Sequence, residues 1–376
     1  MPSADKIPFF NYPALYKRDE SGLLGVMTDV LERGAFILQR DLDAFEAALA
    51  EFLGVRHVFG VADGTNAMIL GLRAAGLKPG DEVILPSHTY VATAASVHFA
   101  GGKPVLADML PDHMIDPASV EKLLTPRTRA IMPVQVNGRT ADMDALRKIA
   151  DAHGLMIFED AAQALGSMYK GRCAGTFGAF GTFSFYPAKV LGCFGDGGAV
   201  VTDDDAVAEQ IALLRDHGRN PEGEVVAWGT NSRLDNMQAA VLLHKLRSYP
   251  AEMERRREIA HMYETALGGI EDIALPPGPD ADPDHYDIYQ NYEIESGRRD
   301  ALRKHLADNG IGTLIQWSGT PVHKMRKLGF TDTLPATEAF FERCFMLPMH
   351  TALSNDDIGR ICATIQGFYR KSAKAA

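Results

Sequence analysis

Short apolar runs alternate with stretches of helical periodicity through the first half of the chain. Each run is long enough for one strand, and several are separated by segments whose apolar residues recur at the spacing of one helix face. The runs cover residues 57–62, 82–86, 104–108, 130–136, 155–160, 180–186 and 198–202, and the helical patterns cover residues 66–75, 91–100, 117–124 and 143–153. This alternation predicts an α/β fold, with a mostly parallel seven-stranded sheet flanked by helices.

The pattern changes after Asp235. Two long helical patterns, with a break at Pro250, are followed by a loop rich in Pro and Asp. Helices are predicted over residues 236–247, 252–267, 300–309, 337–345 and 355–369, the loop over 276–283, and one strand over 288–294. We therefore predict a large domain over residues 1–249 and a smaller C-terminal α+β domain over residues 250–376, on which the N-terminal segment could also pack.

The composition and charge of the chain argue against some classes of partner and location. The chain has 376 residues, 46% of them hydrophobic, and a formal net charge of −11. The acidic balance argues against a nucleic-acid partner, although a local site can still bind a phosphorylated small molecule. No apolar run reaches 18 residues, so no membrane span is expected. Residues 1–6 lack the features of a signal peptide, which predicts a cytoplasmic protein.

The four cysteines do not form a metal or disulfide pattern. They are widely spaced and contain no Cys-x-x-Cys pair; they are Cys173, Cys193, Cys344 and Cys362. We expect free thiols and no metal site.

Asp160 ends an apolar strand. Ligands of open α/β sheets bind at the carboxyl ends of strands. A carboxylate at that edge can hold a protonated ring nitrogen, as pyridoxal 5′-phosphate (PLP) requires of its protein. A helix N-cap is the alternative role for an Asp after a strand.

Lys189 follows 29 residues later, within the apolar segment of residues 182–192 (Thr-Phe-Ser-Phe-Tyr-Pro-Ala-Lys-Val-Leu-Gly). A lysine that forms a Schiff base must lose its proton near neutral pH, and apolar surroundings lower its pKa. The alternative is a solvated loop lysine. A turn of three glycines around Asp196 comes next, which indicates close approach of the backbone.

A phosphate site is predicted after the first strand. Gly64 allows close backbone approach, and Thr65 can offer a hydroxyl and an N–H group at the start of the helix over residues 66–75. Ser184, five residues before Lys189, could donate a second hydroxyl. A plain N-cap at this turn is the alternative.

Together these motifs resemble the DegT/DnrJ/StrS family of sugar aminotransferases, which have the aspartate aminotransferase fold (fold type I of the PLP-dependent transferases). The similarity extends over residues 34–348. It is strongest in residues 80–87 (Gly-Asp-Glu-Val-Ile-Leu-Pro-Ser), 159–164 (Glu-Asp-Ala-Ala-Gln-Ala), 183–189 (Phe-Ser-Phe-Tyr-Pro-Ala-Lys) and 195–199 (Gly-Asp-Gly-Gly-Ala).

The resemblance implies a role for each residue around the PLP ring. Lys189 would form the Schiff base and shuttle a proton between the cofactor and the sugar. Asp160 would pair with the ring nitrogen, and Gln163 would contact the side of the ring hydroxyl. Tyr90 would stack on the ring, unless it is a core aromatic residue.

The resemblance also implies a phosphate site shared between two subunits. Gly64, Thr65 and Ser184 would hold the phosphate, and Asn231 would reach it from the partner subunit. The expected active unit is therefore a homodimer.

The chain departs from the family pattern at two places. Gln135 stands where members often have His, and Gln316-Trp317 stand where a His-Tyr pair is common. The second pair and the nearby His323 fall in the region that contacts sugar in relatives. Trp317 could stack on a sugar face or fill the core, so these departures leave the substrate open.

The function implied is transfer of an amino group, with glutamate as the expected donor, to a keto group of a nucleotide-linked sugar. Residues 231–235 (Asn-Ser-Arg-Leu-Asp) resemble the version of this segment associated with enzymes acting at carbon 3; carbon 4 is the alternative. A PLP-dependent sugar dehydratase of the family would be expected to have His in place of Lys189. A non-catalytic regulator would be expected to have lost the Lys, the Asp or the phosphate turn.

Overall fold

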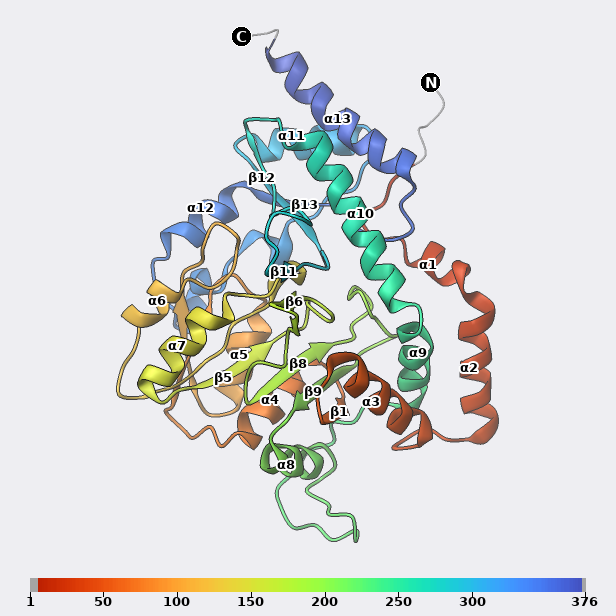
Figure 1. The fold of residues 1–376 in the computed structure, drawn as a ribbon, viewed down its shortest axis with the longest axis vertical. Coiled ribbons are helices and arrows are strands. Elements are labelled where there is room, and N and C mark those ends of the chain that lie inside the picture. The colour runs from red at the N-terminus through yellow and green to blue at the C-terminus, as the bar shows by residue number, and fades with distance from the viewer. Residues whose placement is uncertain (1–5, 374–376) are drawn as a thin grey trace.

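A seven-stranded sheet forms the centre of the larger part of the molecule (Figure 1). The computed structural model describes residues 6–373. The strand order is β1-β9-β8-β5-β4-β2-β3. The strands are β1 (His57–Val61), β2 (Glu82–Pro86), β3 (Lys103–Ala107), β4 (Thr128–Ile131), β5 (Met156–Asp160), β8 (Phe180–Ser184) and β9 (Gly198–Thr202). Each predicted apolar run overlaps one of these strands, so the predicted α/β fold is confirmed.

Strand β9 runs against both of its neighbours, β1 and β8, whereas the pairs from β8 through to β3 are parallel. Both faces of β9 are buried. Ala199 and Val201 pack into one hydrophobic cluster, and Val200 between them packs into another. This two-sided burial explains why the strands are continuously apolar instead of alternating with polar residues.

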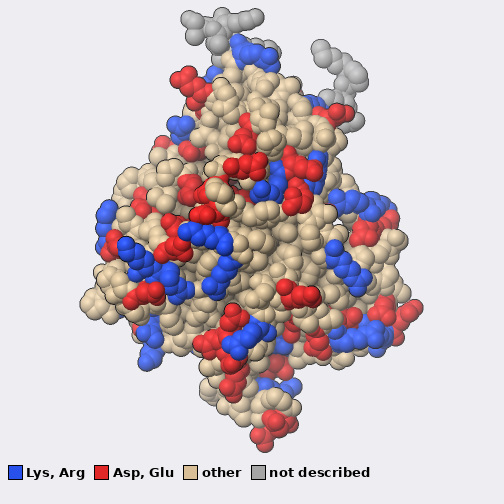
Figure 2. Space-filling view, viewed as in Figure 1, with Lys and Arg blue, Asp and Glu red and all other residues tan. Residues whose placement is uncertain are grey.

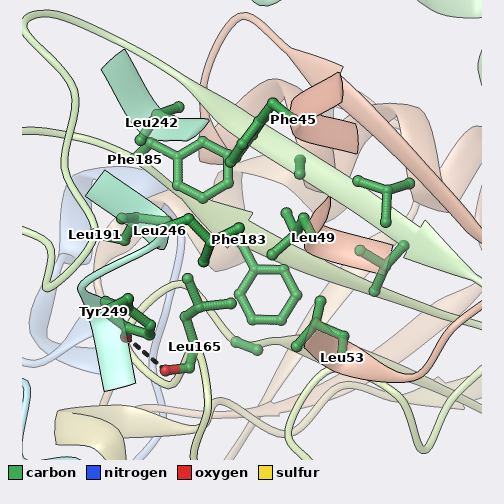
Figure 3. Packing of buried hydrophobic residues seen from close by; sticks show 14 of the residues in the cluster. Phe45, Leu49, Leu53, Leu165, Phe183, Phe185, Leu191, Leu242, Leu246 and Tyr249 are labelled. Atoms are coloured by element: carbon green, nitrogen blue, oxygen red, sulfur yellow. Dashed lines mark hydrogen bonds between the residues drawn. The ribbon is translucent and has the colours of Figure 1, made fainter. Parts of the chain in front are cut away.

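Helices cover both faces of the sheet. One cluster joins α3 (Arg40–Leu53) and α9 (Asn236–Leu246) to the strands, and Figure 3 shows Phe45, Phe183, Phe185 and Leu242 meeting there. The other cluster joins the sheet to α4 and α8. The remaining helices of this part are α4 (Gly64–Ala74), α5 (Val91–Phe99), α6 (Pro117–Lys122), α7 (Met143–His153) and α8 (Asp205–Arg215).

A further hydrophobic cluster lies under three helices at the other end of the molecule, α10 (Tyr249–Leu267), α11 (Arg299–Asp308) and α13 (Asn355–Ala373). They pack on a sheet of order β10-β12-β13, with β10 (Ile273–Ala274), β12 (Tyr292–Ser296) and β13 (Cys344–Leu347). Ile7 belongs to this cluster, and its N–H donates to Gly310 O at 2.9 Å. The domain boundary after residue 249 stays a prediction, but α10 begins there.

The N-terminal helices had not been predicted from the sequence. Helix α1 (Tyr12–Arg18) leads into α2 (Glu20–Arg33), which packs along α9 (Figure 1). Residues 1–5, which bear on the prediction about a signal peptide, lie outside the described residues. No helix within residues 6–373 is both long and apolar enough to cross a membrane.

Three details of the secondary structure differ from prediction. The helix predicted over residues 337–345 is α12 (Pro335–Arg343), and Cys344 begins strand β13, whose four residues are all buried against β12. The strand predicted over 288–294 is β12, which lies four residues later at its start. A small sheet of β6 (Met168–Tyr169), β7 (Arg172–Cys173) and β11 (His285–Tyr286) was missed, because two-residue strands have no readable period. Short 3-10 helices cover Val136–Gly138, Gln316–Gly319, Val322–Lys324 and Arg326–Leu328.

Candidate active site

Asp160 lies at the carboxyl end of β5 with only 5% of its surface exposed. Thr93 Oγ1 donates to its Oδ2 at 2.7 Å, and the backbone N–H of Ala162 donates to its Oδ1 at 3.1 Å. Burial raises the pKa of Asp160, while these hydrogen bonds and the charge of Lys189 act in the opposite direction. The carboxylate is therefore oriented by neutral groups, which leaves its charge available to a cationic ligand.

Lys189 lies in the loop between β8 and β9. Phe185 N–H donates to Gly197 O at 2.7 Å, and Lys189 N–H donates to Tyr186 O at 2.8 Å. Gln290 holds the loop from the other lobe, because its side chain bonds both Val190 N–H and Ala188 O. Burial lowers the pKa of Lys189 to about 8, although the nearby charge of Asp160 opposes this shift. The two predicted catalytic groups thus lie close enough to interact, and the amine is neutral in a large fraction of molecules at mildly alkaline pH.

The predicted phosphate turn meets the end of β8. Asp63 caps α4 by accepting from Asn66 N–H at 2.8 Å, so the N-cap role exists but belongs to Asp63. A Cβ on Gly64 would lie 2.9 Å from Ser184 Cβ, and a Cβ on Gly198 would lie 2.5 Å from the carbonyl carbon of Asp63. Only glycines allow this approach. Thr65 is the second residue of α4, at the positive end of the helix.

Tyr90 is exposed, with 56% of its surface accessible, so it is not a core aromatic residue. It precedes α5, and its carbonyl accepts from Thr93 N–H at 3.1 Å. Tyr90 therefore lies about one helical turn before Thr93, whose hydroxyl donates to Asp160. Asn231 is also exposed, in the segment between α8 and α9, where its backbone pairs with Asp216. Within the described part of one chain, no hydrogen bond joins Asn231 to the phosphate turn.

Gln163 and Gln316 converge on Asn137. The Asn137 N–H donates to Gln163 Oε1 at 2.7 Å, and Gln316 Nε2 donates to Asn137 Oδ1 at 2.7 Å and to Glu293 Oε2 at 2.8 Å. Gln316 is 3% exposed. Its amide hydrogens are therefore used by protein groups, and its contact with substrate stays a prediction.

Trp317 packs against aromatic neighbours. Its ring centroid is 5.4 Å from that of His88 and 6.3 Å from that of Phe341. His323 is fully buried, with Nδ1 2.7 Å from Ser87 Oγ and Nε2 3.3 Å from Glu338 Oε1. Both residues thus have structural roles within the protein, and their contact with the sugar substrate stays a prediction.

The departure at Gln135 has a structural explanation. Its Nε2 donates to Glu159 Oε2 at 2.9 Å, and its Oε1 accepts from Ala141 N–H at 2.7 Å. Glu159 is fully buried and also accepts from the N–H groups of Gly175 and Gly178. Gln135 therefore donates a hydrogen bond to the buried carboxylate of Glu159, a residue of β5.

Among residues 6–373, no group of three His, Cys, Asp or Glu side chains is arranged to hold a metal ion.

Sequence comparison assigns the chain to a protein family. The model of the DegT/DnrJ/EryC1/StrS aminotransferase family matches residues 18–366. The chain belongs to this family. As a member, it is a sugar aminotransferase, and the family implies a PLP-type cofactor. The resemblance expected from the four sequence stretches is confirmed.

Individual relatives cover nearly the whole of this aminotransferase. The dTDP-3-amino-3,4,6-trideoxy-α-D-glucose transaminase of Streptomyces venezuelae is 41% identical over 367 residues, which is 96% of each chain. The crystal structure of S. venezuelae DesV in complex with a ketimine intermediate has a TM-score of 0.93 and 41% identity, and the match covers 97% of this chain and 99% of that one. NtdA of Bacillus subtilis with the bound cofactor PMP has a TM-score of 0.88 and 30% identity, covering 97% and 85%.

Thr93 is the main site residue that sequence analysis missed. It lies inside a predicted helix, where a threonine has no distinctive spacing. Only the packing of α5 against the end of β5 brings its hydroxyl to Asp160.

Proposed function

We propose that this aminotransferase moves an amino group from an amino acid, with glutamate as the expected donor, to carbon 3 of a nucleotide-linked keto sugar. One observation supports the chemistry above others: the amine of Lys189, with a pKa of about 8, lies in the loop after β8 and interacts with the buried carboxylate of Asp160 at the end of the adjacent strand β5. Perturbed pairs of this kind are typical of catalytic sites.

The residues present fit PLP. Asp160 would hold the protonated ring nitrogen, and Tyr90 would cover the ring face; Gln163 would contact the side of the ring hydroxyl. When bound, PLP supplies an electron sink for the carbon that loses a proton. Lys189 would then carry that proton on Nζ, for which its lowered pKa is suited.

The phosphate would be held by Gly64, Thr65 and Ser184. The close approach of Gly64 to Ser184 brings a helix N-terminus and a hydroxyl to one place, which is a favourable arrangement for an anion. Asn231 would complete the site from a partner subunit.

Exposed apolar side chains support a homodimer. Large hydrophobic residues on α2 and in the segment after it are accessible in the single chain, as is Trp228, which has 92% of its surface exposed. The others are Leu24, Leu31, Phe36, Ile37 and Leu38. Exposed apolar residues gathered in one region of a chain are typical of protein interfaces. Trp228 and Asn231 share the segment between α8 and α9, so a partner covering this segment would also be near Asn231.

Transfer to carbon 3 is supported by the segment of residues 231–235 and by the name of the S. venezuelae relative. Ser232 is buried, and its Oγ accepts from Ala62 N–H at 3.5 Å. Enzymes acting at carbon 4 more often have Asn-Tyr-Arg-Met-Thr in this segment, and a tyrosine at position 232 would have to displace that strand end. Arg233 pairs with Asp216 at 2.8 Å, which fixes the course of the segment.

The reverse reaction tests this proposal. The enzyme is incubated with 2-oxoglutarate and with matched 3-amino and 4-amino nucleotide sugars, and the products are identified by mass. Consumption of the 3-amino sugar is expected. Consumption of the 4-amino sugar alone would contradict the position of transfer but not the aminotransferase activity.

A PLP-dependent dehydratase and a non-catalytic regulator are disfavoured by the same residues. Lys189 is present and partly buried, and Asp160 and the phosphate turn are intact. An absorption spectrum of the purified protein with PLP would distinguish the regulator, because a protein without the Lys189 linkage would not shift the absorbance of the cofactor.

A further inference from the structure

A buried carboxylate in the C-terminal part of the chain is not among the groups that the proposed chemistry uses. Glu293, on β12, is 1% exposed, and its Oε2 accepts from Asn137 Nδ2 at 2.8 Å and from Gln316 Nε2 at 2.8 Å. On the face shown in Figure 2, by contrast, carboxylates and basic side chains are interspersed on the surface. The carboxylate of Glu293 is thus enclosed by the protein and binds two side-chain amides.

The charge of Glu293 has little compensation. Across residues 6–373, no Lys or Arg side chain forms an ion pair with it, and His88 Nε2 lies 3.5 Å from its Oε2. Burial raises the pKa of Glu293, but the neighbouring His88 and His113 and the Asn137 amide lower it by more, so the pKa lies below its ordinary value. A buried charge without a close ionic partner is unfavourable for folding, which favours a role for Glu293 beyond stability.

Glu293 helps to hold the side chain of Asn137 at both of its polar atoms. Besides the bond from Nδ2 to Glu293, Asn137 Oδ1 accepts from Gln316 Nε2 at 2.7 Å and from Asn291 Nδ2 at 2.9 Å. The backbone of Asn137 has a φ of 57°, in the left-handed region, which asparagine adopts more readily than most other residues. The side chain thus anchors a tight turn of the larger domain to the C-terminal part of the chain.

The backbone of the same turn orients Gln163. Asn137 N–H donates to Gln163 Oε1 at 2.7 Å. Gln163 lies three residues after Asp160, in a turn where Ala164 N–H donates to Ala161 O at 2.9 Å. Because an N–H group can donate only to the oxygen of a side-chain amide, this bond leaves Nε2 as the donating end of Gln163. The direction of that donor therefore depends on where Asn137 is held.

The chain that leads into Glu293 also holds the lysine loop. Ile288 N–H donates to Gly138 O at 2.9 Å, and the side chain of Gln290 bonds the lysine loop as described above. Residues 288–293 thus contact both the turn that contains Asn137 and the loop that carries the reactive amine. A side chain in this segment can therefore influence the site without touching a ligand.

We propose that Glu293 is a positioning residue for the cofactor: it holds Asn137, whose backbone N–H keeps the donating end of the Gln163 amide available to the ring oxygen of PLP. The inference deepens the proposed function and rests on its PLP site, in which Gln163 would contact the side of the ring hydroxyl. A donor at that oxygen favours the ionised form, which lowers the pH at which the bound cofactor loses its proton. Displacing the donor should raise that pH.

The pH dependence of the absorbance of enzyme-bound PLP tests this role without sugar or turnover. Gln163→Leu removes the donor and defines the full shift. Asn137→Gly removes the side-chain anchor but tolerates the φ of 57°, and Glu293→Leu removes the acceptor. Glu295→Leu is the matched control, because Glu295 lies two residues further along β12 and has Arg343 as its ionic neighbour at 3.6 Å.

The midpoint of the titration should rise by at least about 0.5 pH unit in Asn137→Gly and in Glu293→Leu, and should not change in Glu295→Leu. Because Glu293 acts through Asn137, the double variant should shift no further than Asn137→Gly alone. Glu293→Gln should show a smaller rise, since a neutral oxygen accepts more weakly than a carboxylate, and it carries the test if Glu293→Leu does not fold.

Wild-type midpoints in the folded, PLP-bound Glu293 variants would overturn the proposal, because a purely structural residue would change only the melting temperature. Additive shifts in the double variant would also overturn it, since Glu293 would then act on the cofactor independently of Asn137. Failure of the proposed function is distinguishable from both outcomes: the wild-type enzyme would bind PLP and show these shifts on mutation, but would transfer no amino group to any keto sugar.

Discussion

Replacing Gly64 with alanine tests the phosphate turn directly. The added methyl group would lie 2.9 Å from Ser184 Cβ, 3.4 Å from Ser184 Oγ and 3.5 Å from Ser184 Cα. Carbon atoms in contact prefer a separation of about 3.5–4.0 Å. The turn and the end of β8 must therefore move apart by roughly 0.5–1 Å, and overpacking of this kind costs about 1–3 kcal/mol of folding stability.

The same displacement should weaken binding of PLP. A hydrogen bond to a charged group contributes about 1.5–3 kcal/mol, and a ten-fold change in affinity corresponds to about 1.4 kcal/mol. Losing one such bond from the turn or from Ser184 to the phosphate should reduce PLP affinity by roughly 10- to 100-fold.

The assay is a titration of the cofactor-free enzyme with PLP, followed by absorbance, together with its thermal unfolding. Gly359→Ala is a matched control, because Gly359 lies in α13 and a methyl group added there would meet open space. That substitution should leave PLP affinity unchanged and stabilise the protein by up to about 1 kcal/mol. If Gly64→Ala bound PLP as tightly as wild type, the turn would not be the phosphate site.

Three further predictions concern the remaining site residues. Borohydride reduction with PLP should label the peptide containing Lys189, with a yield that rises between about pH 7 and 9, because the amine reacts only when neutral and its pKa is about 8; mass spectrometry showing another labelled lysine would refute this. Asp160→Asn should retain PLP but slow turnover by roughly two orders of magnitude or more, since the ring nitrogen loses its ionic partner; near-normal turnover would leave Asp160 a structural residue. Mixing Lys189→Ala and Asn231→Ala subunits should restore one working site per heterodimer, and confirmed mixing without recovered activity would count against shared sites.

The strands that carry the site could be predicted because their signal is local. Asp160 ends a continuous apolar run, and such runs are readable wherever a strand is buried on both faces. The lysine loop was equally accessible, since Pro187 and the glycines at 195, 197 and 198 mark its turns. The candidate site residues that the sequence indicated are therefore those at the ends of strands or in the loops that follow them.

The surroundings of these residues could not be predicted, because they depend on contacts between distant segments. Nothing near Gln316 in the sequence indicates that its amide is used by Asn137 and Glu293. The end of α12 was missed for a related reason. Residues 344–347 continue an apolar pattern that suits a helix, and only pairing with β12 makes them a strand.

The pairing of β8 with β5 and with the antiparallel strand β9 limits where the chain can accept insertions and deletions. Asp160 pairs in register with Thr182, and the chain then has seven residues to Lys189 before β9 closes the loop against β8. A one-residue insertion or deletion inside β8 would turn its side chains to the opposite face, moving Phe183 out of its core and shifting the lysine relative to the carboxylate. Length variation should therefore be rare between Thr182 and Lys189.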